Sequence, residues 1–139
     1  MIYFRFGHRI NILARLFARK LNDQLAGTGI TSSQYPVLVR LEQHKSLTQN
    51  ELCEQLFIEP STISKTLDNL EKMGLVMRIS GPNDKREKRV ELTDKAKQNY
   101  PVLLDLILEL QNQILAGIPQ EDLEVFNRVL EKIEDNLKK

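Results

Sequence analysis

The sequence predicts an α+β fold that is mainly helical. Two observations lead to this prediction. Apolar residues recur at spacings of three and four through most of the 139-residue chain, which is the spacing of one face of an α-helix. One stretch in the middle, residues 75–93, changes to the alternation that β-strands need, on either side of the turn residues Gly81 and Pro82. We therefore expect several helices and one β-hairpin.

The first expected helix ends at the glycines of residues 27–29, where the apolar spacing stops. Its apolar face consists of Ile10, Leu13, Phe17, Leu21 and Leu25. The next helix is expected to begin at Thr31, because Gln34 three residues later completes a capping box. Pro36 falls in its first turns, where a missing N–H costs little. The side chains expected to face inward are Tyr35, Leu38, Val39 and Leu41.

Two short helices are expected next. Thr48 and Glu51 form a second capping box, and Pro60 is a good first residue for the following helix, which ends at Gly74. Their expected buried residues are Leu52, Cys53 and Leu56 in the first helix and Ile63, Leu67 and Leu70 in the second. Two short helices joined by a tight turn are typical of a helix-turn-helix. With a hairpin directly after them, they predict a winged helix.

The last third of the chain is expected to be helical again. Thr93 can cap a helix in which Pro101 predicts a kink or a break, and which ends at Gly117. Pro119 is expected to begin the last helix. The apolar face of that helix consists of Leu123, Phe126, Leu130, Ile133 and Leu137.

The helices at the two ends of the chain carry more apolar surface than a small winged helix can cover. We therefore expect a homodimer. Residues 1–30 would form an N-terminal dimerisation helix, 31–93 the winged helix-turn-helix domain and 94–139 the C-terminal dimerisation helices. The expected interface residues are Ile10, Leu13, Phe17, Leu123, Phe126, Leu130, Ile133 and Leu137. The alternative is a monomer that folds these helices onto its own winged helix.

Charge is unevenly distributed, although the net charge is only +1. The acidic excess lies after residue 93, so a surface for a polyanion is expected before it. The N-terminal stretch is interrupted by Arg5, His8, Arg9 and Arg15, so it predicts neither a signal peptide nor a membrane span. A single cysteine, Cys53, agrees with a reducing compartment. We expect a cytoplasmic protein that has no membrane partner.

The second helix of the helix-turn-helix has an outward face suited to DNA. With its apolar residues inside, it exposes short hydroxyls and one cation, which contact phosphates and base edges without steric bulk. The expected DNA-binding residues of this helix are Ser61, Thr62, Ser64, Lys65 and Asn69. The alternative is an ordinary solvated helix face.

The charged hairpin supports the DNA-binding interpretation. At its expected tip, Asp84 can hold Arg86 through a charge-assisted bond. Such an arginine suits the narrow minor groove, where negative potential is concentrated. Lys85, Lys88 and Arg89 can follow the phosphates. The alternative is a solubilising loop with local ion pairs.

Two stretches, "PSTISKTLDNLEKMGLVMR" and "NDKREKRVELTDKA", resemble the MarR (multiple antibiotic resistance regulator) family, and the resemblance covers nearly the whole chain. It implies homodimers that bind pseudo-palindromic operators on double-stranded DNA, mostly as repressors. In that pattern Arg86 takes the minor-groove position, and Arg78 supports the hairpin or contacts a phosphate. The groove-facing positions are Ser61, Thr62, Ser64 and Lys65.

The resemblance also implies a pocket between the dimer helices and the winged helix, commonly for phenolic or other lipophilic anions. The candidate lining residues are Arg9, Arg15, Tyr35 and Tyr100. The alternative is that these four are interface and core residues.

Other functions have weaker support in the sequence. We find no motif of an enzyme, and only two histidines, His8 and His44, which lie far apart; we expect no catalysis, no metal and no cofactor. Some MarR proteins sense oxidants through a cysteine in the first helix, but Cys53 lies elsewhere and is expected in the core. The remaining alternative is a winged helix that binds only proteins; its charged hairpin and hydroxyl-rich helix argue against it.

Overall fold

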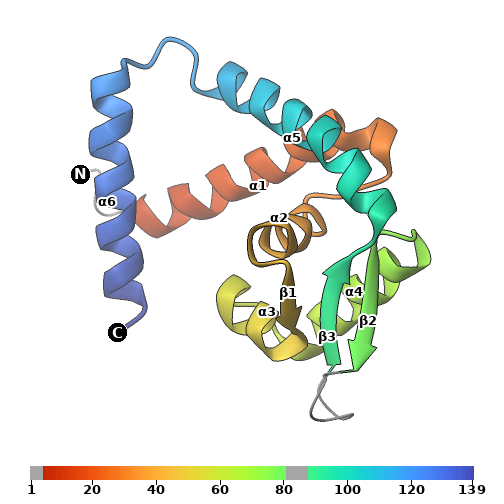
Figure 1. Cartoon of the computed structure of the whole chain (residues 1–139). Helices are drawn as coiled ribbons and strands as arrows, with labels where there is room; N and C mark the ends of the chain where they lie inside the picture. The colour runs from red at the N-terminus through yellow and green to blue at the C-terminus, as the bar shows by residue number, and fades with distance from the viewer. Residues whose placement is uncertain (1–4, 81–87) are drawn as a thin grey trace.

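The computed structural model describes residues 5–80 and 88–139. In this part the chain is mainly helical, with one small sheet (Figure 1). The elements are α1 (Phe6–Leu25), a 3₁₀ turn η2 (Ala26–Thr28), α2 (Tyr35–His44), β1 (Ser46–Thr48), α3 (Gln49–Leu56), α4 (Pro60–Lys72), β2 (Val76–Ser80), β3 (Lys88–Leu92), α5 (Asp94–Ile114) and α6 (Gln120–Leu137). The predicted α+β fold class and the winged helix-turn-helix order are confirmed.

The sheet is antiparallel, with the strand order β1-β3-β2. β3 lies in the middle and pairs with both neighbours, so that Val90 stands opposite Leu47 on β1 and Arg78 on β2. Strand β1 was not among the predicted elements. Three residues are too few to show an alternation, and only the pairing with β3, more than forty residues further along, makes this segment a strand.

One hydrophobic core joins the helix-turn-helix to the sheet and to parts of α1, α2 and α5. Leu21 and Leu25 are its only buried residues from α1, and the N-terminal three-quarters of that helix contributes none. The other core residues are Val37, Leu38, Leu41, Leu47, Leu52, Ile63, Leu67, Leu70, Leu75, Val76, Val90, Leu92, Ala96, Leu103 and Leu110. Cys53 and Leu56 are half-buried against this core.

The two predicted capping boxes have different outcomes. At α3 the box is complete: the Glu51 N–H donates to the Thr48 hydroxyl, and the Thr48 N–H donates to the Glu51 carboxylate, both at 3.1 Å. At Thr31 only the return bond exists, from its N–H to Gln34. The N–H groups of Gln34 and Tyr35 both bond the Thr31 carbonyl, so residues 31–34 form a turn and α2 begins at Tyr35, four residues later than predicted.

This later start changes the buried face of α2. The buried residues are Val37, Leu38 and Leu41, whereas Val39 and Tyr35 are only half-buried. The predicted inward position of Val39 was therefore partly wrong, and Val37 was missed.

Helix α5 runs without a break through Pro101, so the predicted break did not occur. The Thr93 hydroxyl caps the start of the helix by accepting the Ala96 N–H. Buried residues lie on both sides of the proline, Ala96 before it and Leu103 after it. Tertiary packing thus compensates for the one backbone hydrogen bond that proline removes.

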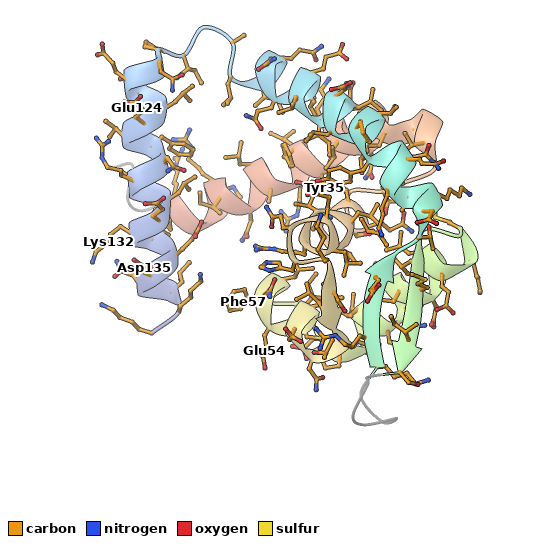
Figure 2. All side chains as sticks on the ribbon, in the orientation of Figure 1. Tyr35, Glu54, Phe57, Glu124, Lys132 and Asp135 are labelled. Atoms are coloured by element: carbon orange, nitrogen blue, oxygen red, sulfur yellow. The ribbon has the colours of Figure 1, made fainter. Side chains whose placement is uncertain are left out.

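Helix α6 stands apart from the winged helix. After the turn at Gly117, which has a left-handed φ of 81°, α6 runs beside the N-terminal end of α1 (Figure 1). Directly after α6, the Lys138 ammonium lies 5.8 Å from the ring centroid of Phe57, which follows α3 and is labelled in Figure 2. No residue of α6 is buried within the described chain.

Candidate nucleic-acid interface

Helix α4 turns one face to the core and the other to solvent. Its first residue is Pro60, preceded by Glu59 in extended conformation, as expected for a proline that begins a helix. Ile63, Leu67 and Leu70 are completely buried and fix the rotation of the helix about its axis. The packing of these three residues therefore determines which face of α4 is exposed.

The predicted DNA-binding residues of α4 lie on or beside this exposed face. Ser61, Lys65 and Asn69 are four residues apart, so they line up along the helix, and Thr62 stands beside them. All four are exposed, whereas Ser64 is half-buried at the edge of the face. The Lys65 ammonium forms no ion pair with any residue that the structure describes. This row of short polar groups with one cation can donate to a phosphate backbone and to base edges.

Arg78 connects strand β2 to α4. Its Nη1 donates to the Asp68 carboxylate at 2.7 Å, its Nη2 donates to the Ser64 carbonyl at 3.1 Å, and Glu71 lies 4.0 Å away. Only 18% of the side chain is exposed. Of the two predicted roles, these contacts favour support of the hairpin over contact with a phosphate, because the guanidinium already bonds α4 to strand β2.

Asp68 and Glu71 are structural partners that the sequence reasoning missed. The charge pattern in the sequence could have predicted these ion pairs. Both acidic residues precede the helix end at Gly74 by less than two turns, and Arg78 follows it by four residues. A chain that reverses direction at Gly74 can bring these opposite charges together. The Thr93 hydroxyl, at 2.6 Å from the Gly74 carbonyl, and the Lys95 ammonium, at 2.9 Å from the Met73 carbonyl, hold the same helix end.

Arg89 connects the wing to the start of α3. Its guanidinium donates to the hydroxyl and the carbonyl of Ser46, at 2.9 and 3.0 Å, and lies 3.9 Å from Glu51. Arg89 thus has protein partners in addition to the phosphate contact predicted for it. Lys88 is exposed at the start of β3. Asp84, Lys85 and Arg86 lie outside the described residues.

The four candidate ligand residues are not brought together in one cavity of the described chain. Arg9 lines a groove between α1 and α6, and Arg15 is exposed on α1. Tyr35 is half-buried where α2 begins, in the middle of the molecule (Figure 2), and Tyr100 lines clefts beside α5. Burial raises the pKa of both tyrosines, and the charge of Glu42 adds to the effect at Tyr100.

The predicted dimer residues form an apolar surface that a single chain leaves open. On α1, Ile10 and Leu13 are 42% and 56% exposed, and on α6, Phe126 is 49% exposed. Phe17 and Leu137 are also exposed, whereas Leu123, Leu130 and Ile133 are partly covered. The groove between α1 and α6 measures about 540 Å³. Exposed apolar neighbours that the prediction omitted are Phe6, Ile12, Leu16, Val125 and Val129.

The described residues contain no group of three or more His, Cys, Asp or Glu side chains arranged to hold a metal ion. They also include no helix that is both long and apolar enough to cross a membrane.

Comparison with known proteins agrees with this geometry. The model of the MarR family matches residues 30–88, which run from the turn before α2 to the start of β3. A protein of Bacillus subtilis strain 168, described as the uncharacterized HTH-type transcriptional regulator YwoH, is 39% identical over 122 residues, which cover 88% of each chain.

Solved structures share the whole architecture. A MarR transcriptional regulator from Methanosarcina mazei Go1 is 27% identical, with 96% of each chain covered and a TM-score of 0.86. A mutant MarR from E. coli complexed with operator DNA is 26% identical, with 91% of each chain covered and a TM-score of 0.85. The resemblance seen in the sequence is thereby confirmed, and the chain belongs to the MarR family of transcriptional regulators.

Proposed function

We propose that the chain is a sequence-specific DNA-binding regulator of transcription that acts as a homodimeric repressor. The observation that carries the proposal is the exposed polar face of α4, next to strand β2, with Lys65, which forms no ion pair with any described residue. Related structures support it, because the E. coli MarR mutant was solved with operator DNA and a Listeria monocytogenes relative with a 26mer DNA. Its relatives are transcriptional regulators, a non-enzymatic family, so we propose no catalytic activity.

The proposed interface has two parts. Helix α4 would enter the major groove, where Ser61, Thr62, Ser64, Lys65 and Asn69 meet base edges and phosphates. The hairpin would reach the minor groove with Arg86, held by Asp84, while Lys85 and Lys88 follow the phosphates. Arg78 and Arg89 would act mainly by fixing α4 and the wing, through the contacts described above.

The proposed dimer uses the helices at both ends of the chain. Residues 1–30 and 94–139 would form the dimerisation region, and residues 31–93 the DNA-binding domain. The open apolar surfaces of α1 and α6 support this division, since exposed apolar patches of this extent mark interfaces. In the dimer, two copies of α4 would enter successive major grooves about 34 Å apart.

We further propose that a small effector releases the repressor from a pseudo-palindromic operator. Release requires that the effector bind more tightly to an arrangement in which the two α4 helices no longer match the groove spacing. The proposed location is the cytoplasm, where the operator lies.

The test is fluorescence anisotropy of the full-length protein with the DNA upstream of its own gene, at two salt concentrations and with a scrambled duplex as control. We expect tight, salt-sensitive binding that favours the native duplex. Equal binding to both duplexes would contradict a sequence-specific regulator, and absence of binding to either would support a winged helix that binds only proteins.

A further inference from the structure

Phe57, in the turn between α3 and α4, has an unfavourable backbone conformation. It is the C-cap residue of α3, where its N–H donates to the Cys53 carbonyl, and its φ of 55° is left-handed. A bulky side chain is strained at such a φ, and glycine or asparagine is the usual residue there. The ring is also 74% exposed, so burial does not offset the strain. Neither the backbone nor the core explains why a phenylalanine occupies this position.

The ring of Phe57 has a cationic neighbour from the other end of the sequence. The Lys138 ammonium lies over the ring, 5.8 Å from its centroid, which is within the range of a cation–π interaction. Glu134 and Asp135 precede Lys138 by four and three residues, which are the spacings of ion pairs on a helix. Lys138 nevertheless forms no ion pair with any described residue. Its ammonium is therefore directed to the aromatic ring rather than to a nearby carboxylate.

Helix α4 is held unequally at its two ends. The side chains of Thr93 and Lys95 donate to the carbonyls that directly follow the helix, and Arg78 bonds its middle. The N-terminal end has no side-chain cap, since the carboxylate of Glu59 at the N-cap accepts no hydrogen bond from the helix. The residues proposed to enter the major groove begin at this less constrained end.

The contact between Phe57 and Lys138 lies next to this uncapped end. Phe57 precedes Pro60, the first residue of α4, by three residues. In Figure 2, Phe57 lies on the side of α3 nearer to α6, the helix that Lys138 follows. A ring held from outside restricts the backbone of the turn, and the turn determines where α4 starts.

We propose that Phe57 and Lys138 are positioning residues for DNA binding, which together fix the turn before α4 and the direction of its N-terminal end. A helix already fixed in the unbound protein loses less conformational freedom on binding, so its affinity for DNA is higher. The strained φ of Phe57 is then retained because it directs the ring towards Lys138. The inference rests on the proposed function, in which α4 is the helix that enters the groove.

The contact itself can be measured without DNA, because the chain contains no tryptophan. Phe57→Trp keeps an aromatic face for the ammonium and introduces a single indole fluorophore at the contact. In this background, Lys138→Gln is expected to change the intensity and wavelength of the indole emission, since it removes the cation beside the ring. Lys139→Gln removes the same charge at the next residue and should leave the emission unchanged. Identical spectra with and without Lys138 would overturn the proposal.

Anisotropy titrations with the duplex from upstream of the gene measure the effect on DNA binding. We expect Lys138→Gln and Phe57→Leu each to weaken binding about threefold, as expected for one exposed cation–π contact. The double variant should lose no more than either single variant, because both remove the same contact. The melting temperature of Phe57→Leu should stay close to that of wild type, since the ring is mostly exposed.

Three further variants separate this contact from a general effect of charge. Phe57→Trp and Lys138→Arg keep a ring and a cation, so both should bind DNA as wild type does. Lys139→Gln is the charge-matched control and should also retain wild-type affinity. Equal losses for Lys138→Gln and Lys139→Gln, or additive losses in the double variant, would overturn the positioning role.

The outcomes distinguish this inference from the proposed function. If wild type shows no preference for the native duplex, the proposed function fails, and the positioning role fails with it. If wild type discriminates the native duplex and Lys138→Gln binds it equally well, the regulatory function stands and only the positioning role is overturned.

Discussion

Lys65 and Arg78 are both basic residues near the proposed interface, but their surroundings differ. Lys65 is exposed and has no ion pair with any described residue, whereas Arg78 is mostly covered and bonds Ser64 and Asp68. A cation that is free in the unbound protein can give its whole charge to a phosphate. One that already holds two elements together contributes chiefly to the fold.

Lys65→Ala is expected to weaken DNA binding without altering stability, because the side chain is exposed. If Lys65 contacts one phosphate, the plot of log affinity against log salt concentration should become shallower by about one unit. Anisotropy titrations at several salt concentrations measure this slope, and Lys20→Ala, on the exposed surface of α1, is the control. An unchanged slope with an altered sequence preference would instead indicate a base contact.

Arg78→Leu is expected to lower the free energy of unfolding by about 1–2 kcal/mol, since it removes the hydrogen bonds from the guanidinium to the Ser64 carbonyl and to the Asp68 carboxylate. Urea denaturation followed by circular dichroism measures the loss. Asp68→Asn is the matched comparison; because Asp68 is 55% exposed, this variant should cost much less. Wild-type stability of Arg78→Leu would show that the connection between β2 and α4 is unimportant for folding.

The helix caps show which contacts can be predicted from residues close together in the sequence. The capping box at Thr48 and Glu51 and the cap at Thr93 form as predicted, because both atoms of each bond lie within one turn. The box at Thr31 forms only in part, since the chain there closes a turn ahead of α2 and buries Gln34. A capping motif therefore located a chain reversal correctly and the start of the helix incorrectly.

Thr48→Ala is expected to destabilise the protein by about 1 kcal/mol, because the Glu51 N–H loses its acceptor. Thr48→Ser should retain most of that stability, since it keeps the hydroxyl. Thermal unfolding of both variants provides the measurement. Equal losses for alanine and serine would mean that the methyl group of Thr48, and not the cap, stabilises this segment.

The pKa of Glu51 is lowered, first by the hydrogen bond from the backbone N–H of Thr48 and then by its hydroxyl. A carboxylate with a lowered folded-state pKa stabilises the protein above its unfolded-state pKa, about 4.3, and loses that contribution as the pH falls. We expect wild type to be more stable than Glu51→Gln at pH 7, with the difference shrinking below pH 4.3. Glu54→Gln, on the exposed side of the same helix, should show no such convergence.

The whole molecule has two parts. The winged helix has a well-packed core, whereas most of α1 and all of α6 lie outside that core. The core includes only the last turns of α1, and no residue of α6 is fully buried among the described residues. Large side chains on α1 and α6 remain exposed in one copy. Such surfaces are stable in solution only when a second copy or another partner covers them.

Phe126→Glu is therefore expected to weaken the dimer at least about 100-fold, because a charge would be buried without a partner at the interface. Light scattering after size-exclusion chromatography measures the mass. Asn127→Glu, which adds the same charge at the next position of α6, should leave the dimer intact. If both variants keep the dimer mass, the interface does not include this face of α6.

Patterns within a few turns of sequence were sufficient to predict much of this protein: the order of elements, helix α4 and its outward residues, most caps, and the family itself. Each of these depends on residues within a few turns of one another, where spacing alone constrains geometry. Strand β1, the unbroken α5 and the partners of Arg78 and Arg89 depend instead on contacts between distant segments, such as the pairing of Ser46 with Glu91 in the sheet. Such contacts follow from how the core packs, and no local spacing reveals them before the chain is folded.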